Sequence, residues 1–335
     1  MSSSIDRRRF LAGGTLTGMA FTTGLLVKTS PAFAQAVTYK LAFPDNAQHP
    51  SMKVAQRFAA NVAQKTNGRI KIDVFPGGTL GSETNIVAGL QTGTVDFTMH
   101  TAGYVSSYVP TVGALDIPFV FKDKAAGRKV LAGEVGRQLA ADALAKNIVV
   151  LGWSQNGWRN VESVDRTITA PKDFNGLKIR IQAGPIFAAM FKQLGAVPVV
   201  IDAADLYVAL QQKTIEAIEI PLPSTVSFKT FEVAKHIALT HHVYNATLFM
   251  ASKPKLEALS AADQQVVRVA GLDASNYWFD LLGQAEEEAQ KFCQANGSTV
   301  SRVNFNEFHA AMGPVYEEAK TRYGDIVNKL LASAG

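Results

Sequence analysis

The sequence has few of the residues that build disulfide-bonded, zinc-binding or nucleic-acid-binding proteins. It has one cysteine, Cys293, in 335 residues, which excludes an intramolecular disulfide framework and a cysteine-rich zinc module. Only 18% of the residues are charged and 47% are hydrophobic, so a sizeable core is expected and disorder is not. No run of Lys and Arg with interleaved aromatic residues follows residue 34, so no nucleic-acid partner is expected.

The usual catalytic and cofactor-binding motifs are also missing. The chain contains no Gly-x-Ser-x-Gly elbow, no Gly-x-x-x-x-Gly-Lys phosphate loop and no His-Glu-x-x-His zinc helix. The glycine-rich segment 76–81 lacks the dinucleotide-binding spacing and is interpreted as a tight turn. No carboxylate stands at helical spacing from His236, His241 or His242 to complete a ligand set. We therefore predict neither a metal nor a cofactor.

The first 34 residues have the order of a secretory signal. Three arginines, residues 7–9, precede a weakly apolar stretch over 11–27 and a small-x-small cleavage site ending at Ala34. The Arg-Arg-x-Phe-Leu order is typical of the twin-arginine export route, and an ordinary secretory signal is the alternative. Several glycines argue against a membrane anchor, and no later segment reaches transmembrane length. This segment carries +3 of the net charge of +5, and we expect a soluble periplasmic protein after cleavage.

The rest of the chain alternates between strand and helix periodicities. This order predicts an α/β fold with mostly parallel sheets. Strands are expected at 38–43, 69–75, 95–99, 148–153, 177–182, 197–200 and 214–220, and helices at 51–66, 82–91, 185–194, 203–212, 261–296 and 306–331.

The only composition shift that suggests a boundary is at 155–157. It predicts a first lobe that ends near residue 156 and a ligand cleft between two α/β lobes. In the helical region 261–296, the three glutamates 286–288 are interpreted as a solvated helix face. Cys293 is interpreted as a packed thiol rather than a nucleophile.

Two arginines are candidates for binding an anion. Arg180 lies inside the strand 177–182, and Arg159 follows the proposed boundary. A guanidinium is always charged, and its planar fork can hold a carboxylate through two parallel hydrogen bonds. Taken alone, each is more simply interpreted as an ordinary surface or ion-paired arginine, and pattern reading goes no further.

Three strings together carry a resemblance to one family. They are Gly-Leu-Lys-Ile-Arg-Ile at 176–181, Gln-Leu-Gly-Ala-Val-Pro-Val at 193–199 and Asp-Leu-Tyr-Val-Ala-Leu-Gln-Gln at 205–212. With segments 75–81, 93–97 and 118–121 in the same order, the chain resembles the extracytoplasmic solute-binding proteins of TRAP (tripartite ATP-independent periplasmic) transporters. The resemblance covers about residues 38–323.

The resemblance implies a two-lobed periplasmic-binding-protein fold with a hinge, an interlobe cleft and a helical C-terminal region. The implied first lobe comprises 35–156 and about 246–285, and the second comprises 157–245 and about 286–335. The implied partners are a small organic acid and the membrane permease subunits. The implied ligand-binding residues are Arg180, which matches the carboxylate-binding arginine, and Arg159, Glu83, His100, Thr101, Tyr104, Glu219 and Ile220.

The sequence departs from the family pattern at two of these places. Ile220 stands where the family often has an asparagine that shares the carboxylate, and Ala203 stands where some members have an aromatic residue. Both changes alter the predicted cleft. A calcium- or sodium-assisted site occurs in some relatives, but only Glu219 could contribute to one here.

The resemblance implies a transport protein rather than an enzyme. The first alternative is a periplasmic enzyme on the same scaffold, with Glu83, His100 or Tyr104 as acid–base groups on a carboxylate substrate. The second is a binding protein that serves an ATP-driven importer or a sensor kinase. The identity of the acid stays open.

Overall fold

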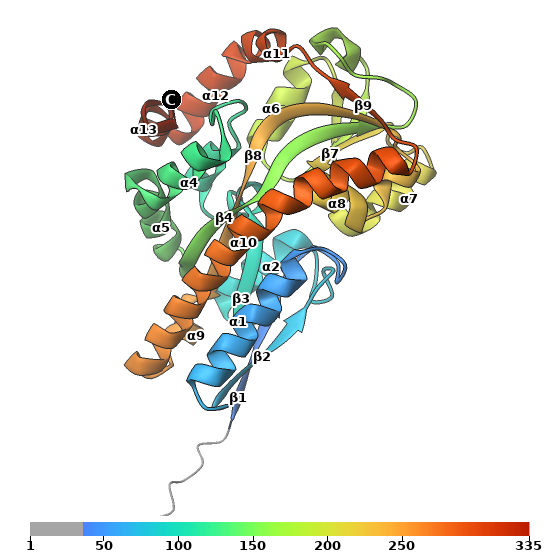
Figure 1. Ribbon diagram of the computed structural model, residues 1–335. Helices are drawn as coiled ribbons and strands as arrows, with labels where there is room; N and C mark the ends of the chain where they lie inside the picture. The colour runs from blue at the N-terminus through green and yellow to red at the C-terminus, as the bar shows by residue number, and fades with distance from the viewer. Residues whose placement is uncertain (1–35, 335) are drawn as a thin grey trace, which may run out of the picture. The chain divides into compact units, whose positions relative to one another are not determined.

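The computed structural model describes residues 36–334, and the predicted signal peptide, residues 1–34, lies outside this range. Within residues 36–334 no helix combines the length and apolarity that a bilayer span requires. The described chain is an α/β structure built on one mixed sheet (Figure 1).

The N-terminal half begins with strands and helices in alternation. The elements are β1 (Val37–Ala42), α1 (Ser51–Lys65), β2 (Ile70–Phe75), α2 (Glu83–Thr92), β3 (Phe97–Thr101) and α3 (Ala102–Val105). Gly93 ends α2 with a left-handed φ of 75°, a conformation that glycine adopts without steric cost. The turn after β2 also contains two left-handed glycines, Gly77 and Gly78, which agrees with the predicted tight turn.

Helices then lead into the first of two long strands. The elements are the 3-10 helix η1 (Pro110–Asp116), α4 (Lys124–Ala132), α5 (Glu134–Leu144) and β4 (Ile148–Ser163). They are followed by η2 (Pro171–Phe174), β5 (Lys178–Ile181), α6 (Pro185–Gln193), β6 (Val197–Val200), η3 (Ala203–Asp205), α7 (Leu206–Gln211) and β7 (Ala217–Pro221).

The C-terminal part is mainly helical apart from the second long strand. Its elements are α8 (Leu222–Ser227), η4 (Thr230–Glu232), β8 (His236–Ser252), α9 (Lys253–Glu257), α10 (Ala261–Ala295), β9 (Thr299–Arg302), α11 (Phe305–Ala311), α12 (Gly313–Tyr323) and α13 (Asp325–Ala334). The 35-residue helix α10 runs along both long strands (Figure 1).

The sheet joins two α/β halves through β4 and β8. Its strand order is β2-β1-β3-β8-β4-β7-β5-β6, with β9 paired to β8. The outer pairs are parallel, whereas β3–β8, β4–β8 and β4–β7 are antiparallel. Because β4 and β8 pair along most of their length, they form a ribbon that reaches from β3 on one side to β7 on the other.

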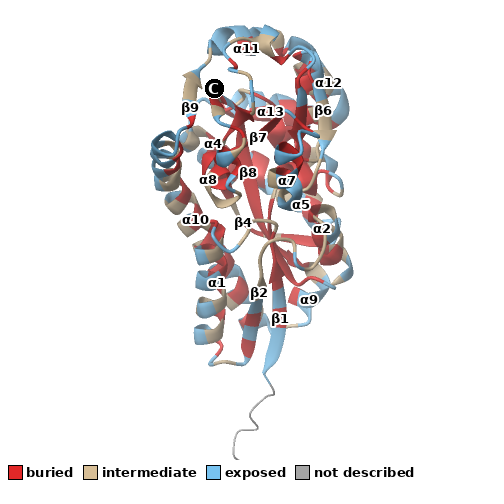
Figure 2. Ribbon diagram, turned by 90° about the vertical axis from the view of Figure 1, so that its right-hand side faces the viewer, coloured by how far each residue is buried: buried red, intermediate tan, exposed pale blue. Residues whose placement is uncertain are grey.

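The buried side chains lie along this ribbon and under the helices that cover it. Strands β4, β7 and β8 are almost entirely buried, whereas the outer faces of α1 and α10 are exposed (Figure 2). One apolar cluster joins α1, β1–β3 and the first half of α10, and a larger one joins α4, α5, α6 and the C-terminal helices.

Three predictions of secondary structure were wrong in extent. The strand predicted at 148–153 continues to Ser163, the helix predicted at 306–331 is three helices, and the strand predicted at 95–99 lies at 97–101. The strand β8 was missed entirely. Gly324, with a φ of 66°, separates α12 from α13, because a left-handed residue cannot continue a right-handed helix.

Candidate functional site

A cavity lies where β3, β4, β5, β7, β8 and α10 approach one another. The space open to the centres of water molecules is about 40 Å³. Seven of the eight predicted ligand-binding residues line it, namely Glu83, His100, Thr101, Tyr104, Arg159, Arg180 and Ile220. Glu219, the eighth, is fully buried behind Arg159 and does not line the cavity.

Arg180 points into this cavity from strand β5 and is only 2% exposed. Its Nε donates to the backbone carbonyl of Ile201 at 2.6 Å, which fixes the plane of the guanidinium. Its Nη2 donates to the Tyr104 hydroxyl at 3.2 Å. Among residues 36–334 no acceptor is bonded to Nη1, so this edge of the fork is open to a ligand.

Arg159 also lines the cavity, but protein groups occupy its fork. Nε and Nη2 donate to the Glu219 carboxylate, with Nη2 at 2.8 Å from Oε1, and Nη1 donates to Gln182 Oε1 at 3.1 Å. Burial alone would raise the pKa of Glu219, but Arg159 and His242 lower it to about 2. The pair is therefore fully charged at neutral pH.

Glu83 faces Arg180 from the first turn of α2. Ser82 begins this helix by accepting the backbone N–H of Asn85. Burial raises the pKa of Glu83 to about 7, against the opposing effects of Arg180 and Tyr104. Because its Oε2 lies 3.9 Å from Arg180 Nη2, beyond hydrogen-bond distance, Glu83 does not occupy the fork.

His100 is held as a neutral hydrogen-bond donor. Its Nδ1 accepts the backbone N–H of Thr101 at 3.0 Å, so the ring proton is on Nε2. Burial lowers the pKa of His100 to about 3, although the nearby backbone carbonyl of Glu83 opposes this effect. Nε2 is buried and makes no hydrogen bond within the described residues.

Other side chains of the cavity share this lack of partners. Asn245 has neither its amide nitrogen nor its oxygen bonded, and the Trp278 Nε1 and Asn156 Oδ1 atoms are also buried and unbonded within residues 36–334. An unbonded buried polar group costs free energy, so a cavity rich in such groups favours a polar ligand that bonds to them. Asn245 was missed because β8 was not predicted, and Asn156 was missed because it was assigned to the boundary at 155–157. No local pattern singled out Trp278 within the helical region 261–296.

The structure gives little support to the metal sites considered from the sequence. Within residues 36–334 no group of three or more His, Cys, Asp or Glu side chains is arranged to hold an ion. Instead, His242 contacts Glu219 at 3.3 Å, and His236 contacts the hydroxyls of Thr167 and Thr299. Cys293 is buried within α10, and burial raises the pKa of its thiol to about 12, as suits a packed side chain.

Glu286 departs from the predicted solvated face. Its Oε1 accepts the backbone N–H of Trp158 at 2.6 Å, and its other oxygen pairs with Lys124. Glu287 and Glu288 are exposed, as expected. Glu286 therefore ties α10 to β4 at the point where β4 changes register.

Comparison with known proteins identifies the family. The family described as "Bacterial extracellular solute-binding protein, family 7" matches residues 44–322. The chain is 33% identical over 302 residues to the 2,3-diketo-L-gulonate-binding periplasmic protein of Escherichia coli K12, which covers 89% of this chain and 91% of the relative.

Solved structures give the same result. The sugar acid binding protein of Advenella mimigardefordensis, in complex with galactonate, is 26% identical and superposes with a TM-score of 0.87, covering 90% of this chain and 98% of that one. A TRAP periplasmic solute-binding protein of a Polaromonas species, bound to D-erythronate, is 28% identical with a TM-score of 0.86, covering 88% and 98% of the two chains.

Proposed function

The chain belongs to the family 7 extracellular solute-binding proteins, the binding components of TRAP transporters, and from that premise we propose that its cavity captures a small hydroxylated monocarboxylate. One observation carries the proposal: a fixed arginine with an open edge lines the same cavity as several unbonded polar groups. The arginine corresponds to the carboxylate end of such an acid, and the unbonded polar groups correspond to its hydroxylated end.

The carboxylate end is assigned to Arg180. The ligand would accept hydrogen bonds from Nη1 and Nη2, and the bond from Nε to Ile201 keeps the fork in place before binding. A carboxylate in this cavity loses its water shell, and charge-assisted hydrogen bonds from a guanidinium replace it. Tyr104 and Glu83 would complete the surroundings of this end.

The hydroxylated end is assigned to His100, Asn245 and Trp278. His100 Nε2 and Trp278 Nε1 only donate, whereas Asn245 both donates and accepts. A hydroxyl group both donates and accepts, so a chain of hydroxyls can satisfy all three residues, and a hydrocarbon chain satisfies none. Galactonate, D-erythronate and 2,3-diketo-L-gulonate, the ligands named for the three relatives, are acids with several oxygen substituents.

The cavity volume sets the size of the acid. If a space of 40 Å³ for water centres is treated as a sphere and extended by one water radius, the ligand volume is roughly 180 Å³. This volume accommodates an acid of about six carbons and excludes a disaccharide. Ile220, in place of the family asparagine, makes one wall apolar.

We assign the lobes as the resemblance implies, with 36–156 and about 246–285 in one and 157–245 and about 286–334 in the other. The breaks in β4 and β8 lie opposite each other, since Gln155 pairs with Ala246, Trp158 pairs with Tyr244, and the register shifts between them. Glu286 of α10, which lies at the assigned boundary between the lobes, accepts the backbone N–H of Trp158. Closure about these points would bring together Tyr104 and Arg180, and Thr101 and Gln182, which are hydrogen-bonded in the structure.

We also propose the context in which the protein works. The relatives named above are periplasmic, and the leader with its site near Ala34 fits export to that compartment. The captured acid would pass to the integral-membrane subunits of a TRAP permease, with no chemical change.

One observation bears on the enzyme alternative. Ser224 lines the cavity with its Oγ 3.5 Å from His49 Nε2, and His49 Nδ1 lies 3.3 Å from Asp45, an arrangement that resembles a hydrolytic triad. However, the Ser51 hydroxyl contacts His49 Nδ1 at 2.8 Å and donates to Asp45 at 3.1 Å, and the 3.5 Å between Ser224 Oγ and His49 Nε2 is at the limit of a hydrogen bond, so the three residues do not form the direct, aligned chain of a hydrolytic triad. We therefore assign this group to contact between the lobes, together with the bond from Asn46 to the carbonyl of Ser227.

The test is calorimetry on the mature protein with D-galactonate, D-erythronate and hexanoate, beside an Arg180→Ala variant. We expect at least one hydroxylated acid to bind and to require Arg180. Hexanoate should bind through Arg180 with an affinity at least about a hundredfold lower, because it leaves His100, Asn245 and Trp278 unbonded. Equal Arg180-dependent binding of hexanoate would contradict the assignment of the polar end. A hydroxylated acid that binds Arg180→Ala as tightly as the unaltered protein would contradict the assignment of the carboxylate end.

A further inference from the structure

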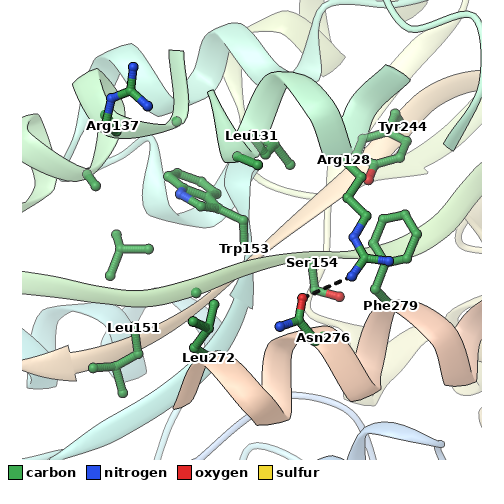
Figure 3. Close-up of a pocket in the computed structure, with 15 residues that line it drawn as sticks. Arg128, Leu131, Arg137, Leu151, Trp153, Ser154, Tyr244, Leu272, Asn276 and Phe279 are labelled. Atoms are coloured by element: carbon green, nitrogen blue, oxygen red, sulfur yellow. Dashed lines mark hydrogen bonds between the residues drawn. The ribbon is translucent and has the colours of Figure 1, made fainter. Parts of the chain in front are cut away.

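A second, larger cavity lies between α4, α5, β4 and α10. It is separate from the cavity that Arg180 lines, which is called the cleft from here on. The space open to water centres is about 360 Å³. Its walls are mainly apolar, with Leu131, Leu151, Trp153 and Leu272 among them (Figure 3). A cavity of this size with apolar walls is typical of small-molecule sites.

Polar groups gather at one end of this cavity. The hydroxyls of Ser154 and Tyr244 are buried, each residue being 2% exposed, and neither makes a hydrogen bond within residues 36–334. Burial raises the pKa of the Tyr244 hydroxyl, so it stays a donor at neutral pH. The guanidinium of Arg128 lies beside them (Figure 3). Its Nη2 donates to Asn276 at 3.0 Å, its Nη1 pairs with the exposed Asp280 at 3.4 Å, and it stacks 4.5 Å from the centre of the Phe279 ring.

We propose that this cavity is a second ligand site, for an amphiphilic monocarboxylate whose anionic group bonds to Ser154, Tyr244 and Arg128 and whose hydrocarbon part contacts Leu131, Leu151 and Leu272. Two hydroxyl donors and a guanidinium suit a carboxylate, which only accepts hydrogen bonds. The apolar walls suit a hydrocarbon chain and would leave the hydroxyls of a sugar acid unbonded. The two cavities therefore select different acids.

The second site adjoins the cleft through three shared segments. Ser154, Tyr244 and Asn276 line the second cavity, and their near neighbours Asn156, Asn245 and Trp278 line the cleft. The segments of β4 and β8 include points assigned to the hinge, and the α10 segment precedes the assigned boundary at about 285. Any coupling between the two sites through these segments acts by the same factor in both directions.

The test is calorimetry with octanoate as the probe on the mature protein. Ala140→Trp on α5 fills the second cavity, and Ala141→Trp, at an exposed position of the same helix outside the cavity lining, is the matched control. We expect octanoate to bind the unaltered protein and the Ala141→Trp variant, and to bind Ala140→Trp at least tenfold more weakly. Ser154→Ala and Tyr244→Phe, which keep the shape of the site, should each weaken binding by about fivefold or more.

Arg180→Ala separates this site from the cleft. Octanoate binding that survives Arg180→Ala and is lost in Ala140→Trp supports the second site. Octanoate binding that is lost in Arg180→Ala and kept in Ala140→Trp places the probe in the cleft and overturns the proposal. Absence of octanoate binding to the unaltered protein up to its solubility limit also overturns it.

Discussion

Arg180 and Arg159 are both buried beside the same cavity, at 2% and 3% exposure, and they differ in what their forks hold. Arg159 is occupied by Glu219 and Gln182, whereas Arg180 holds one carbonyl and one hydroxyl and keeps Nη1 open. Residue type and burial are thus the same, and the partners differ. A ligand carboxylate at Arg180 meets an open donor, and at Arg159 it would have to displace a charged partner.

Substitutions of the two arginines should differ most in their effect on the free energy of unfolding. Arg159→Ala leaves the Glu219 carboxylate buried without its cation, which costs about 3–5 kcal/mol. Urea unfolding of the ligand-free protein measures this loss. The double variant Arg159→Met/Glu219→Gln should recover much of it, because no unpaired charge stays buried. An Arg159→Ala variant as stable as the unaltered protein would contradict the assigned role.

The next effect should be on binding through Arg180. Arg180→Lys should weaken binding of the cognate acid by tenfold or more, because an ammonium is a point charge and cannot reproduce the planar fork. The free energy of unfolding of the ligand-free variant should fall by about 1–3 kcal/mol, since the charge-assisted hydrogen bonds from the guanidinium to Ile201 and Tyr104 are lost. Calorimetry that shows unchanged affinity would remove Arg180 from its role.

A smaller effect concerns Glu83, which lies opposite Arg180. Its pKa of about 7 means that it ionises near neutral pH, and a bound carboxylate would raise that pKa further. Binding then takes up a proton, so affinity should fall severalfold for each pH unit above about 7. Glu83→Gln should bind with a flat pH profile. An unchanged pH slope in this variant would show that another group titrates.

The smallest effect extends the comparison to two buried carboxyls on neighbouring strands. Glu162 is bonded only to the hydroxyls of Thr225 and Thr230, and burial raises its pKa to about 7. Its contribution to stability is full below its ordinary pKa of 4.5 and is lost as pH rises through 7. Glu219, with its lowered pKa, contributes above 4.5 and loses its contribution only as pH falls through about 2.

Melting temperatures measured between about pH 4.5 and pH 7 test this difference. The unaltered protein should lose a few degrees over this window, and Glu162→Gln should lose less, because a glutamine does not titrate. Equal slopes for the two proteins would contradict the account of Glu162.

Elements that a short stretch of sequence defines were predicted well, and elements that depend on long-range strand pairing were not. The bounds of β6 and the start of α10 were predicted correctly because short apolar runs and a long helical pattern identify them. Strand β8 was missed because it pairs with three strands and is buried on both faces, so it has no simple alternation of polar and apolar residues. The continuation of β4 past Gly157 was missed for a related reason, since the glycine looks like a turn but marks a register shift within a strand.

The cleft was predictable to the extent that the family resemblance supplied positions. Arg180 and Tyr104 lie together as expected, but the resemblance could not tell that Arg159 is occupied by Glu219. That ion pair depends on strands β4 and β7 being neighbours, a long-range pairing that periodicity does not encode. Asn245 and Trp278 reach the cleft only because β8 and α10 cross it, so no local pattern points to them.

The most direct test is a crystal structure of the protein with its cognate acid bound. We predict that the ligand carboxylate lies within hydrogen-bond distance of Nη1 and Nη2 of Arg180, with the pair of Arg159 and Glu219 intact. A carboxylate bound instead to Arg159, with Glu219 displaced, would contradict the account.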